Sequence, residues 1–283
     1  MKVAIIGSKG QLGSDLVKVF KKETIIPLAH EDIEVTDYNS CTKLRNLSPE
    51  VVINTAAFHK TDACEDEPLK AFNVNAVGSR NVAQICKEIG AVYIYISTDY
   101  VFDGTKGKPY TESDPTSPIN TYGISKVAGE HCAKFSDKYY IIRVSSLFGV
   151  AGASGKGGNF VETMIQKAEK KEEIKVVDDI VMSPTYTRDA ALTIKNIVNN
   201  KLPFGVYHCS NKGYCSWYEF AKSIFDFLSL EVNLKPIKTD ELTQRAKRPK
   251  FSALKSEKLE KHGLKMNEWR EALREYLKEK KHL

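Results

Sequence analysis

The 283-residue sequence has no Cys-x-x-Cys pair and no histidines at zinc spacing beside its six cysteines. Those spacings mark zinc sites and redox dithiols, so both classes of site are excluded. The cysteines are scattered, and several lie in apolar stretches, so we expect buried or inert thiols in a reducing, cytoplasmic setting. Their positions are Cys41, Cys64, Cys86, Cys132, Cys209 and Cys215.

Long hydrophobic runs are also absent. No apolar stretch approaches the roughly 20 residues that cross a bilayer. The N-terminal Met1-Lys2 leads at once into a short strand pattern and glycines, so we expect neither a signal peptide nor a membrane anchor. The basic C-terminal part contributes to a net charge of +6 but has no compact basic run interleaved with aromatics. We expect a solvated basic surface, with a phosphate-bearing ligand as the alternative, and no nucleic-acid partner.

Short apolar runs alternate with amphipathic stretches through the first half of the chain. This alternation predicts an α/β fold with a Rossmann-like, doubly wound parallel sheet. After residue 148 the elements become shorter, which predicts a smaller C-terminal α/β lobe. Strands are expected at 2–6, 24–28, 51–54, 91–96, 140–144, 174–177 and 206–208. Helices are expected at 11–22, 62–88, 122–135, 160–170, 188–199, 217–228 and 269–280.

A glycine-rich turn follows the first predicted strand, with Gly7, Gly10 and Gly13 spaced Gly-x-x-Gly-x-x-Gly. This spacing differs from the Gly-x-Gly-x-x-Gly dinucleotide fingerprint, but it stands between a strand and a helix as that motif requires. The helix N-terminus would then face a pyrophosphate. The second strand ends in Ala29-His30-Glu31-Asp32, with no Arg and with acids that come slightly late. The choice between NADH and NADPH therefore stays open.

Two further features point to proton-transfer chemistry. Ser97-Thr98-Asp99 follows the strand at 91–96, where open α/β sheets place chemistry. Tyr122 and Lys126 stand four positions apart, so on a helix they share one face. A free tyrosine titrates near ~10, and a nearby cation favours the phenolate. We therefore expect Lys126 to lower the pKa of Tyr122.

These features occur together and in order, and with them the chain resembles the extended short-chain dehydrogenase/reductase superfamily. Within it, the sequence is most similar to the dTDP-4-dehydrorhamnose reductase family, and the similarity covers essentially the whole chain. The stretch Ser97–Gly104 and the C-terminal Arg-Pro motif are its more specific parts. The motifs that carry it are Gly7–Gly13, Asn54–Ala57, Asn73–Gly78, Ser97–Gly104, Tyr122–Lys126, Gly158–Phe160, Pro184–Thr187, Ser216–Phe220, and Arg248-Pro249 with Ser252 and Leu254.

The resemblance implies an enzyme that uses NADPH or NADH to reduce the C4 ketone of a nucleotide-linked 4-keto-6-deoxy sugar, in dTDP-L-rhamnose synthesis. It implies that Tyr122 protonates the developing alkoxide, that Lys126 tunes Tyr122 and holds the nicotinamide ribose, and that Thr98 positions the carbonyl. The implied substrate contacts are Thr98, Asp99 and Tyr100 at the sugar, with Asn159 and Arg248 at the nucleotide. The implied cofactor contacts are Gly7, Gly10, Gln11, Leu12, Gly13, Glu34, Val35, Ala56, Ala57, Tyr122 and Lys126.

The resemblance also implies a division of the chain. Residues 1–148, with a return segment near 178–205, would form the NAD(P)-binding Rossmann domain, and residues 149–283 would mainly form the nucleotide-sugar-binding lobe. The glycine-rich stretch 149–159 is either a linker or a flap over substrate. No residue set argues for the magnesium site through which some relatives dimerise, and we expect a monomer or homodimer with no metal.

Alternatives remain at three points. Members of the family often have Trp where this chain has Ser146, which keeps open a reductase or epimerase of another nucleotide sugar. A regulatory subunit with the same fold is a further alternative, although the presence of Thr98, Tyr122 and Lys126 together argues against it. We expect the aromatics that begin at Trp217 to be core rather than ligand-stacking, and the acidic run 62–67 to begin a helix rather than bind metal.

Overall fold

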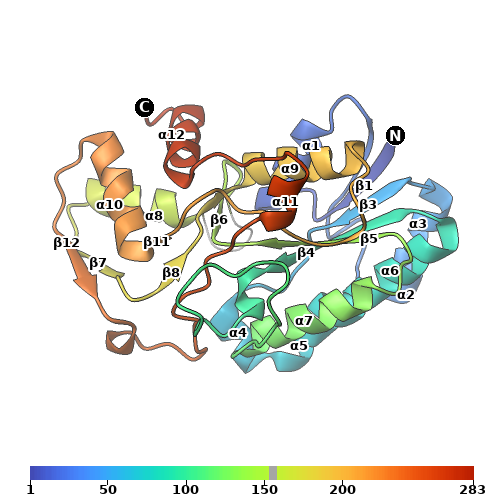
Figure 1. The fold of residues 1–283 in the computed structure, drawn as a ribbon, viewed down its shortest axis with the longest axis horizontal. Coiled ribbons are helices and arrows are strands. Elements are labelled where there is room, and N and C mark those ends of the chain that lie inside the picture. The colour runs from blue at the N-terminus through green and yellow to red at the C-terminus, as the bar shows by residue number, and fades with distance from the viewer. Residues whose placement is uncertain (153–157) are drawn as a thin grey trace.

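The computed structural model describes residues 1–152 and 158–283 and is built around a six-stranded parallel sheet (Figure 1). The strand order is β10-β5-β4-β3-β1-β2. Interior residues such as Val3, Ile53 and Ile94 are fully buried, as expected for strands covered on both faces. The strands are β1 (Lys2–Ile6), β2 (Thr24–Leu28), β3 (Val51–Asn54), β4 (Val92–Thr98), β5 (Tyr139–Val144) and β10 (Gly205–His208).

Helices cover both faces of this sheet, which confirms the predicted doubly wound fold (Figure 1). On one face, α1 (Gln11–Val19) and α9 (Thr187–Asn199) pack through Leu16 and Ile194, with α11 (Glu257–Lys261) beside β10. On the other face lie α2 (Tyr38–Cys41), α3 (Lys43–Leu47), α6 (Gly78–Ile89) and α7 (Thr121–Ala133), with Val82 and Ala133 in the core.

The single helix expected over 62–88 is wrong, because four shorter elements replace it. They are α4 (Thr61–Asp66), α5 (Pro68–Phe72), a π-helix η1 (Asn73–Val77) and then α6. Glu67 has φ −123° and ψ 60°, outside the helical region, and the ring of Pro68 begins the next helix. In η1, the buried Asn75 side chain donates to Phe58 O at 3.0 Å and to Ser125 Oγ at 2.9 Å. The π-helix therefore ties α7 to the loop that follows β3.

The remaining elements pack around a second hydrophobic core, on the left in Figure 1. Phe148, Phe220 and Tyr276 are among its buried side chains. Its helices are α8 (Phe160–Glu169), α10 (Trp217–Leu228) and α12 (Trp269–Glu279). Its paired strands are β7 (Ile174–Val177) with β12 (Leu234–Ile237), β8 (Val181–Met182) with β11 (Cys215–Ser216), and β6 (Leu147–Phe148) with β9 (Thr185–Tyr186).

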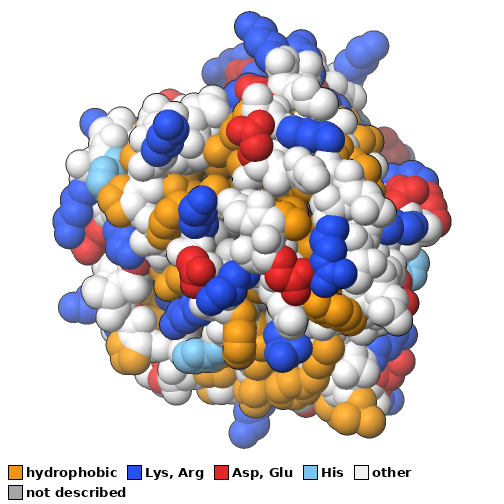
Figure 2. Space-filling view, turned by 90° about the vertical axis from the view of Figure 1, so that its right-hand side faces the viewer, with side chains coloured by type: hydrophobic (Ala, Val, Ile, Leu, Met, Phe, Trp, Pro, Cys, Tyr) orange, Lys and Arg blue, Asp and Glu red, His pale blue; other side chains and the backbone are white. Residues whose placement is uncertain are grey.

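Between these elements the chain returns to the large sheet through α9 and β10, and β10 pairs in parallel with β5. Of the stretch 149–159, residues 153–157 lie outside the described residues, so the choice between linker and flap stays a prediction. Within the described part of the chain, no helix is long and apolar enough to span a membrane. On the face that Figure 2 shows, Lys and Arg side chains are interspersed with Asp and Glu.

Candidate active site

A cavity of about 1030 Å³ opens over the carboxyl ends of the parallel strands. Its wall includes Ile6 at the end of β1, Thr55 just after β3, Thr98 at the end of β4 and Val144 at the end of β5. Strand order reverses between β1 and β3, and ligands of open α/β sheets bind at such a switch point. The expected site residues that line the cavity are Gly7, Gly10, Gln11, Leu12, Glu34, Val35, Ala56, Ala57, Thr98, Asp99, Tyr100, Tyr122, Lys126 and Asn159.

The glycine turn closes one side of the cavity with backbone. Gly7 has φ +78°, and a Cβ there would lie 2.4 Å from Thr55 Oγ1. Gly13 does not line the cavity, and a Cβ there would lie 2.1 Å from Gly7 O, so its role is to let α1 pack on the turn. Gly10 is the N-cap of α1 and also lines the cavity. Backbone at a helix N-terminus suits a pyrophosphate, so the turn fits the expected dinucleotide.

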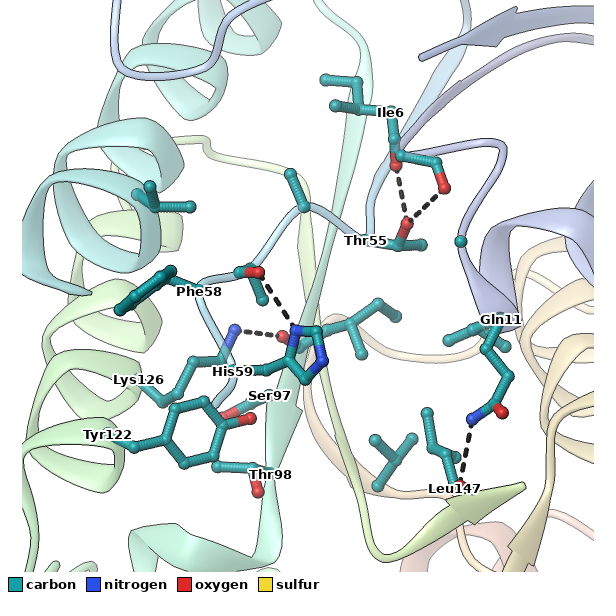
Figure 3. Close-up of a pocket in the computed structure, with 18 of the residues that line it drawn as sticks. Ile6, Gln11, Thr55, Phe58, His59, Ser97, Thr98, Tyr122, Lys126 and Leu147 are labelled. Carbon is teal, nitrogen blue, oxygen red and sulfur yellow. Dashed lines mark hydrogen bonds between the residues drawn. The ribbon is translucent and has the colours of Figure 1, made fainter. Parts of the chain in front are cut away.

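Tyr122 lies in the first turn of α7. Its side chain points into the cavity toward the end of β4, where Ser97 and Thr98 lie (Figure 3). Asn120 caps this helix by accepting from Gly123 N at 2.8 Å, which fixes where the first turn begins. The Tyr100 ring packs edge-on against Tyr122, with centroids 5.9 Å apart. Tyr122, Tyr100 and Thr98 therefore line one cavity, and their roles in the reaction stay predictions.

Lys126 lies one turn further along α7 and is only 1% exposed. Its Nζ donates to Ile96 O at 2.7 Å (Figure 3). The same atom lies 4.1 Å from the centroid of the Tyr95 ring. Burial lowers the pKa of Lys126 to about 7, and the nearby Glu130 carboxylate opposes that shift. The buried ammonium is thus held by a backbone carbonyl of β4.

The expectation that Lys126 lowers the pKa of Tyr122 needs correction. Burial raises the pKa of Tyr122 above its usual value, while a hydrogen bond with Thr98 works against that rise and the Asp99 carboxylate adds to it. The largest cause is desolvation, because the phenolate would be buried. In this arrangement the Tyr122 phenol is protonated at neutral pH, which is the state from which it could donate a proton.

Asp99, in the 3₁₀ turn η2 (Asp99–Val101), is 3% exposed and already well bonded. Its Oδ1 accepts from Thr98 Oγ1 at 3.1 Å, and its Oδ2 accepts from Ser145 Oγ at 3.0 Å and from Ser252 Oγ. Burial raises the pKa of this carboxyl to about 6, and the three hydroxyls oppose the rise. Asp99 therefore joins β4, β5 and the segment around Ser252 behind the cavity.

A second buried network holds α7 against the sheet. Glu130 of α7 forms an ion pair with Arg143 of β5, with Oε2 and Nη2 2.8 Å apart, and accepts from Ser97 Oγ at 2.6 Å. Both charged side chains are less than 7% exposed. Removing one partner would strand a buried charge, so this pair fixes α7 against β4 and β5.

Asn159 and Arg248, the two residues expected at the nucleotide, differ in their position relative to the cavity. Asn159 lines the cavity, but its amide caps α8 by accepting from Glu162 N at 3.1 Å and donates to Tyr276 Oη at 2.9 Å. Arg248 lies outside the cavity lining, and its Nη2 donates to Asp62 Oδ2 at 3.1 Å. Its charge nonetheless acts on the neighbouring Tyr100, which does line the cavity.

Sequence reasoning missed part of the cavity wall. Phe58 and His59 follow β3, and Lys70 comes from α5; no strand-end motif singled them out. Trp217 packs against the second core, as expected, but it is half-buried and also lines the cavity, where it contacts Phe160 with ring centroids 4.6 Å apart. No signal in the sequence pointed to this second role, since Trp217 lies three, four and seven positions before the buried Phe220, Ala221 and Ile224 and therefore on the same apolar stripe.

The chain matches the RmlD substrate binding domain family over residues 1–282. It belongs to this family. Among curated relatives, the spore coat polysaccharide biosynthesis protein SpsK of Bacillus subtilis (strain 168) is 40% identical over 99% of this chain and 98% of its own. Membership of the RmlD family confirms the resemblance seen in the sequence.

Solved structures of RmlD relatives share the whole fold. A dTDP-4-dehydrorhamnose reductase from Clostridium acetobutylicum is 39% identical, with a TM-score of 0.93 over 98% of this chain and 99% of that one. A dTDP-4-dehydrorhamnose reductase from Bacillus anthracis, solved in complex with NADP, gives the same identity, TM-score and coverage. The overall architecture is therefore that of the RmlD family.

Proposed function

We propose that the protein is a dTDP-4-dehydrorhamnose reductase, which reduces the C4 ketone of dTDP-4-dehydro-6-deoxy-L-mannose to give dTDP-L-rhamnose. The observation that carries the proposal is the convergence of Thr98, Tyr122 and Lys126 on the cavity that the glycine turn also lines. The broader class, an NAD(P)H-dependent oxidoreductase, is confirmed by membership of the RmlD family. A reductase that supplies activated rhamnose also suits a relative named for polysaccharide synthesis.

The cofactor fits the cavity from the glycine turn to Lys126. The turn and the N-terminus of α1 would hold the pyrophosphate, with Ala56 beside it, and Val35 would pack against the adenosine half. When bound, the reduced nicotinamide supplies the hydride. Lys126 would turn from Ile96 O toward the nicotinamide ribose. Because its backbone is fixed in α7, its ammonium group would stay within this part of the cavity.

Tyr122 is the proposed acid. Its phenol would donate a proton to the C4 oxygen as negative charge develops there. Thr98 would hold the same oxygen, because its hydroxyl stands beside Tyr122 at the end of β4. Asp99 accepts from that hydroxyl, so it would orient Thr98 as well as border the sugar. Tyr100 would flank the sugar from the other side.

The aromatic pair Phe160 and Trp217 would serve the substrate at the far end of the cavity. Its rings offer flat apolar surface that a sugar or base can cover, and Asn159 lies next to it. Arg248 is proposed to serve the nucleotide through its neighbour Tyr100 and its own charge.

A reductase or epimerase of another nucleotide-linked 4-keto-6-deoxy sugar is the second candidate. Ser146 favours it, since this small residue lines the cavity where family members often carry Trp. Ser146 also has φ +45°, a backbone conformation in which a bulky side chain is strained. A sugar bound beside Ser146 would therefore meet a small side chain.

The experiment is oxidation of NADPH and of NADH in the presence of dTDP-4-keto-6-deoxyglucose and its 3,5-epimerase. Rapid oxidation that requires the epimerase would support the proposed reductase. Oxidation without the epimerase would favour the second candidate. No oxidation by protein that binds the cofactor would contradict the proposed substrate. The six free thiols suit a cytoplasmic enzyme, which we propose to act as a monomer or homodimer.

A further inference from the structure

Tyr122, the proposed acid, is the second residue of α7, and the ends of a helix are the parts that open most readily. The first turn also lies directly on η2, since a Cβ on Gly123 would be 2.2 Å from Tyr100 O. A shift of this turn would therefore move the Tyr122 phenol relative to Thr98. A displacement of about 1 Å between reacting groups can cost roughly 10²-fold in rate, so the contacts that fix this turn bear on turnover.

Two side chains hold the start of α7. Asn120, its N-cap, accepts from Gly123 N and donates through Nδ2 to Lys247 O at 2.8 Å. Glu65 of α4 holds the first position of the helix. Its Oε1 accepts from Thr121 N at 2.9 Å, and its Oε2 accepts from Thr121 Oγ1 at 2.6 Å. A carboxylate at this end of α7 also faces the positive end of the helix dipole.

Glu65 belongs to the acidic run 62–67, but its environment differs from that of its neighbours. Asp66 and Glu67 are exposed and pair with exposed cations, so water and salt screen their contacts. Glu65 is half-buried, and both of its carboxylate oxygens bond to α7. Its contacts are therefore less screened and better able to hold a neighbouring element.

We infer that Glu65 is a positioning residue for the proton transfer, which acts through Thr121 on Tyr122. The inference rests on the proposed function, since it takes Tyr122 as the acid. Helix α4 can support this role, because Cys64 is fully buried and its thiol donates to Phe58 O in the cavity wall at 3.5 Å. Glu65 does not line the cavity itself, so its contribution is to set where the proton donor stands.

The first test compares kcat and KM in folded variants. Glu65→Ala should lower kcat by roughly 10-fold, because the first turn of α7 loses two bonds. KM for the nucleotide sugar and the dissociation constant of NADPH should stay within about threefold of native, because the cavity wall is unchanged. Glu65→Gln keeps an oxygen that accepts from Thr121 N, so it should retain kcat within about threefold of native. Native kcat in Glu65→Ala would overturn the inference.

A double variant shows whether Glu65 acts through Tyr122. Tyr122→Phe has already lost the proton donor, so adding Glu65→Ala should lower kcat by less than about twofold further. If the added loss is as large as in the native background, Glu65 acts on another step and the inference is overturned.

Glu112→Ala is the matched control. Glu112 is also half-buried, and its Oε1 also accepts from backbone N–H groups of distant segments, those of His208 at 3.1 Å and Lys258 at 3.3 Å. These groups belong to β10 and α11 rather than to α7. Glu112→Ala should therefore lower the free energy of unfolding but leave kcat within about twofold of native. A loss of kcat equal to that of Glu65→Ala would show a general effect of destabilisation and overturn the inference.

Amide hydrogen exchange separates a failure of this inference from a failure of the proposed function, because it needs no substrate. The amides of residues 121–123 should exchange roughly tenfold faster in Glu65→Ala and at the native rate in Glu112→Ala. Unchanged exchange in Glu65→Ala would overturn the inference whichever sugar the protein reduces. Native kcat in Tyr122→Phe, or no turnover of the proposed substrate by the native protein, would instead count against the proposed function.

Discussion

The Nζ atom of Lys126 lies 2.7 Å from the carbonyl oxygen of Ile96, so α7 is bonded to β4 by the side chain expected to serve the cofactor. The same bond gives the ammonium a hydrogen-bond partner inside the protein, since Lys126 is only 1% exposed to solvent. Chemistry and fold stability therefore share one side chain, and both can be measured.

The first prediction concerns pH and stability. Burial lowers the pKa of Lys126 to about 7, so between pH 7 and about 10 the unfolded chain holds a proton that the folded chain has released. Stability contributed by this residue therefore rises with pH across that window. Urea denaturation measures the free energy of unfolding of the native protein and of Lys126→Met. The value for the native protein minus the value for the variant should increase from pH 7 to 9.5. The exposed Lys212→Met gives the control, and equal slopes in both variants would contradict the buried charge.

Tyr122→Phe should lower kcat by about 10²- to 10⁴-fold, the range that a positioned general acid contributes. NADPH affinity should stay near that of the native protein, because the ring still fills its place against Tyr100. Tyr100→Phe keeps the same ring packing and should mainly raise KM. Native turnover in Tyr122→Phe would remove Tyr122 from the proton transfer.

Ser252→Ala should destabilise the fold by about 1.5–3 kcal/mol, because it removes a buried hydrogen bond to the Asp99 carboxylate. Ser210→Ala is the control. Ser210 is 3% exposed, and its Oγ has no hydrogen-bond partner within the described residues. Ser210→Ala should therefore leave the free energy of unfolding almost unchanged. Unfolding in urea measures both, and equal losses in the two variants would show that the Asp99 bond is not what Ser252 contributes.

Trp217 should report substrate binding. The protein has two tryptophans; Trp269 is 1% exposed in the second core, whereas Trp217 lines the cavity. Addition of dTDP should change the intrinsic fluorescence of the native protein and of Trp269→Phe. The change should vanish in Trp217→Phe. A signal that survives in Trp217→Phe would place the nucleotide away from α10.

Arg248→Ala should mainly raise the KM of the nucleotide sugar and leave kcat within a few-fold. Asp62→Asn is informative beside it, because Asp62 holds Arg248 through the 3.1 Å contact. If Arg248 binds the nucleotide, Arg248→Ala should raise KM much more than Asp62→Asn. Similar KM values in both variants would indicate that Arg248 attaches its own segment to α4 and does not bind the nucleotide.

Much of the fold could be predicted from the sequence, because alternating apolar runs and helical periodicity are local signals. The glycine turn, Thr98 and Tyr122 could be predicted because each belongs to a motif at a strand or helix end. The engagement of Lys126 by Ile96 could not, since it depends on how closely α7 approaches β4. The partners of Asp99 could not be predicted either, because Ser145 and Ser252 come from distant segments that only the folded chain brings together.

The π-helix at Asn73–Val77 has a consequence for insertions and deletions. Its wider turn carries one residue more than an α-helix needs, and Asn75 O there accepts from Tyr95 Oη at 2.8 Å. Deleting one residue from 73–77 would restore an ordinary helix and remove the wide turn that presents Asn75 O to Tyr95 Oη. Natural and designed relatives should therefore tolerate exchanges of residue type in this stretch better than any change in its length.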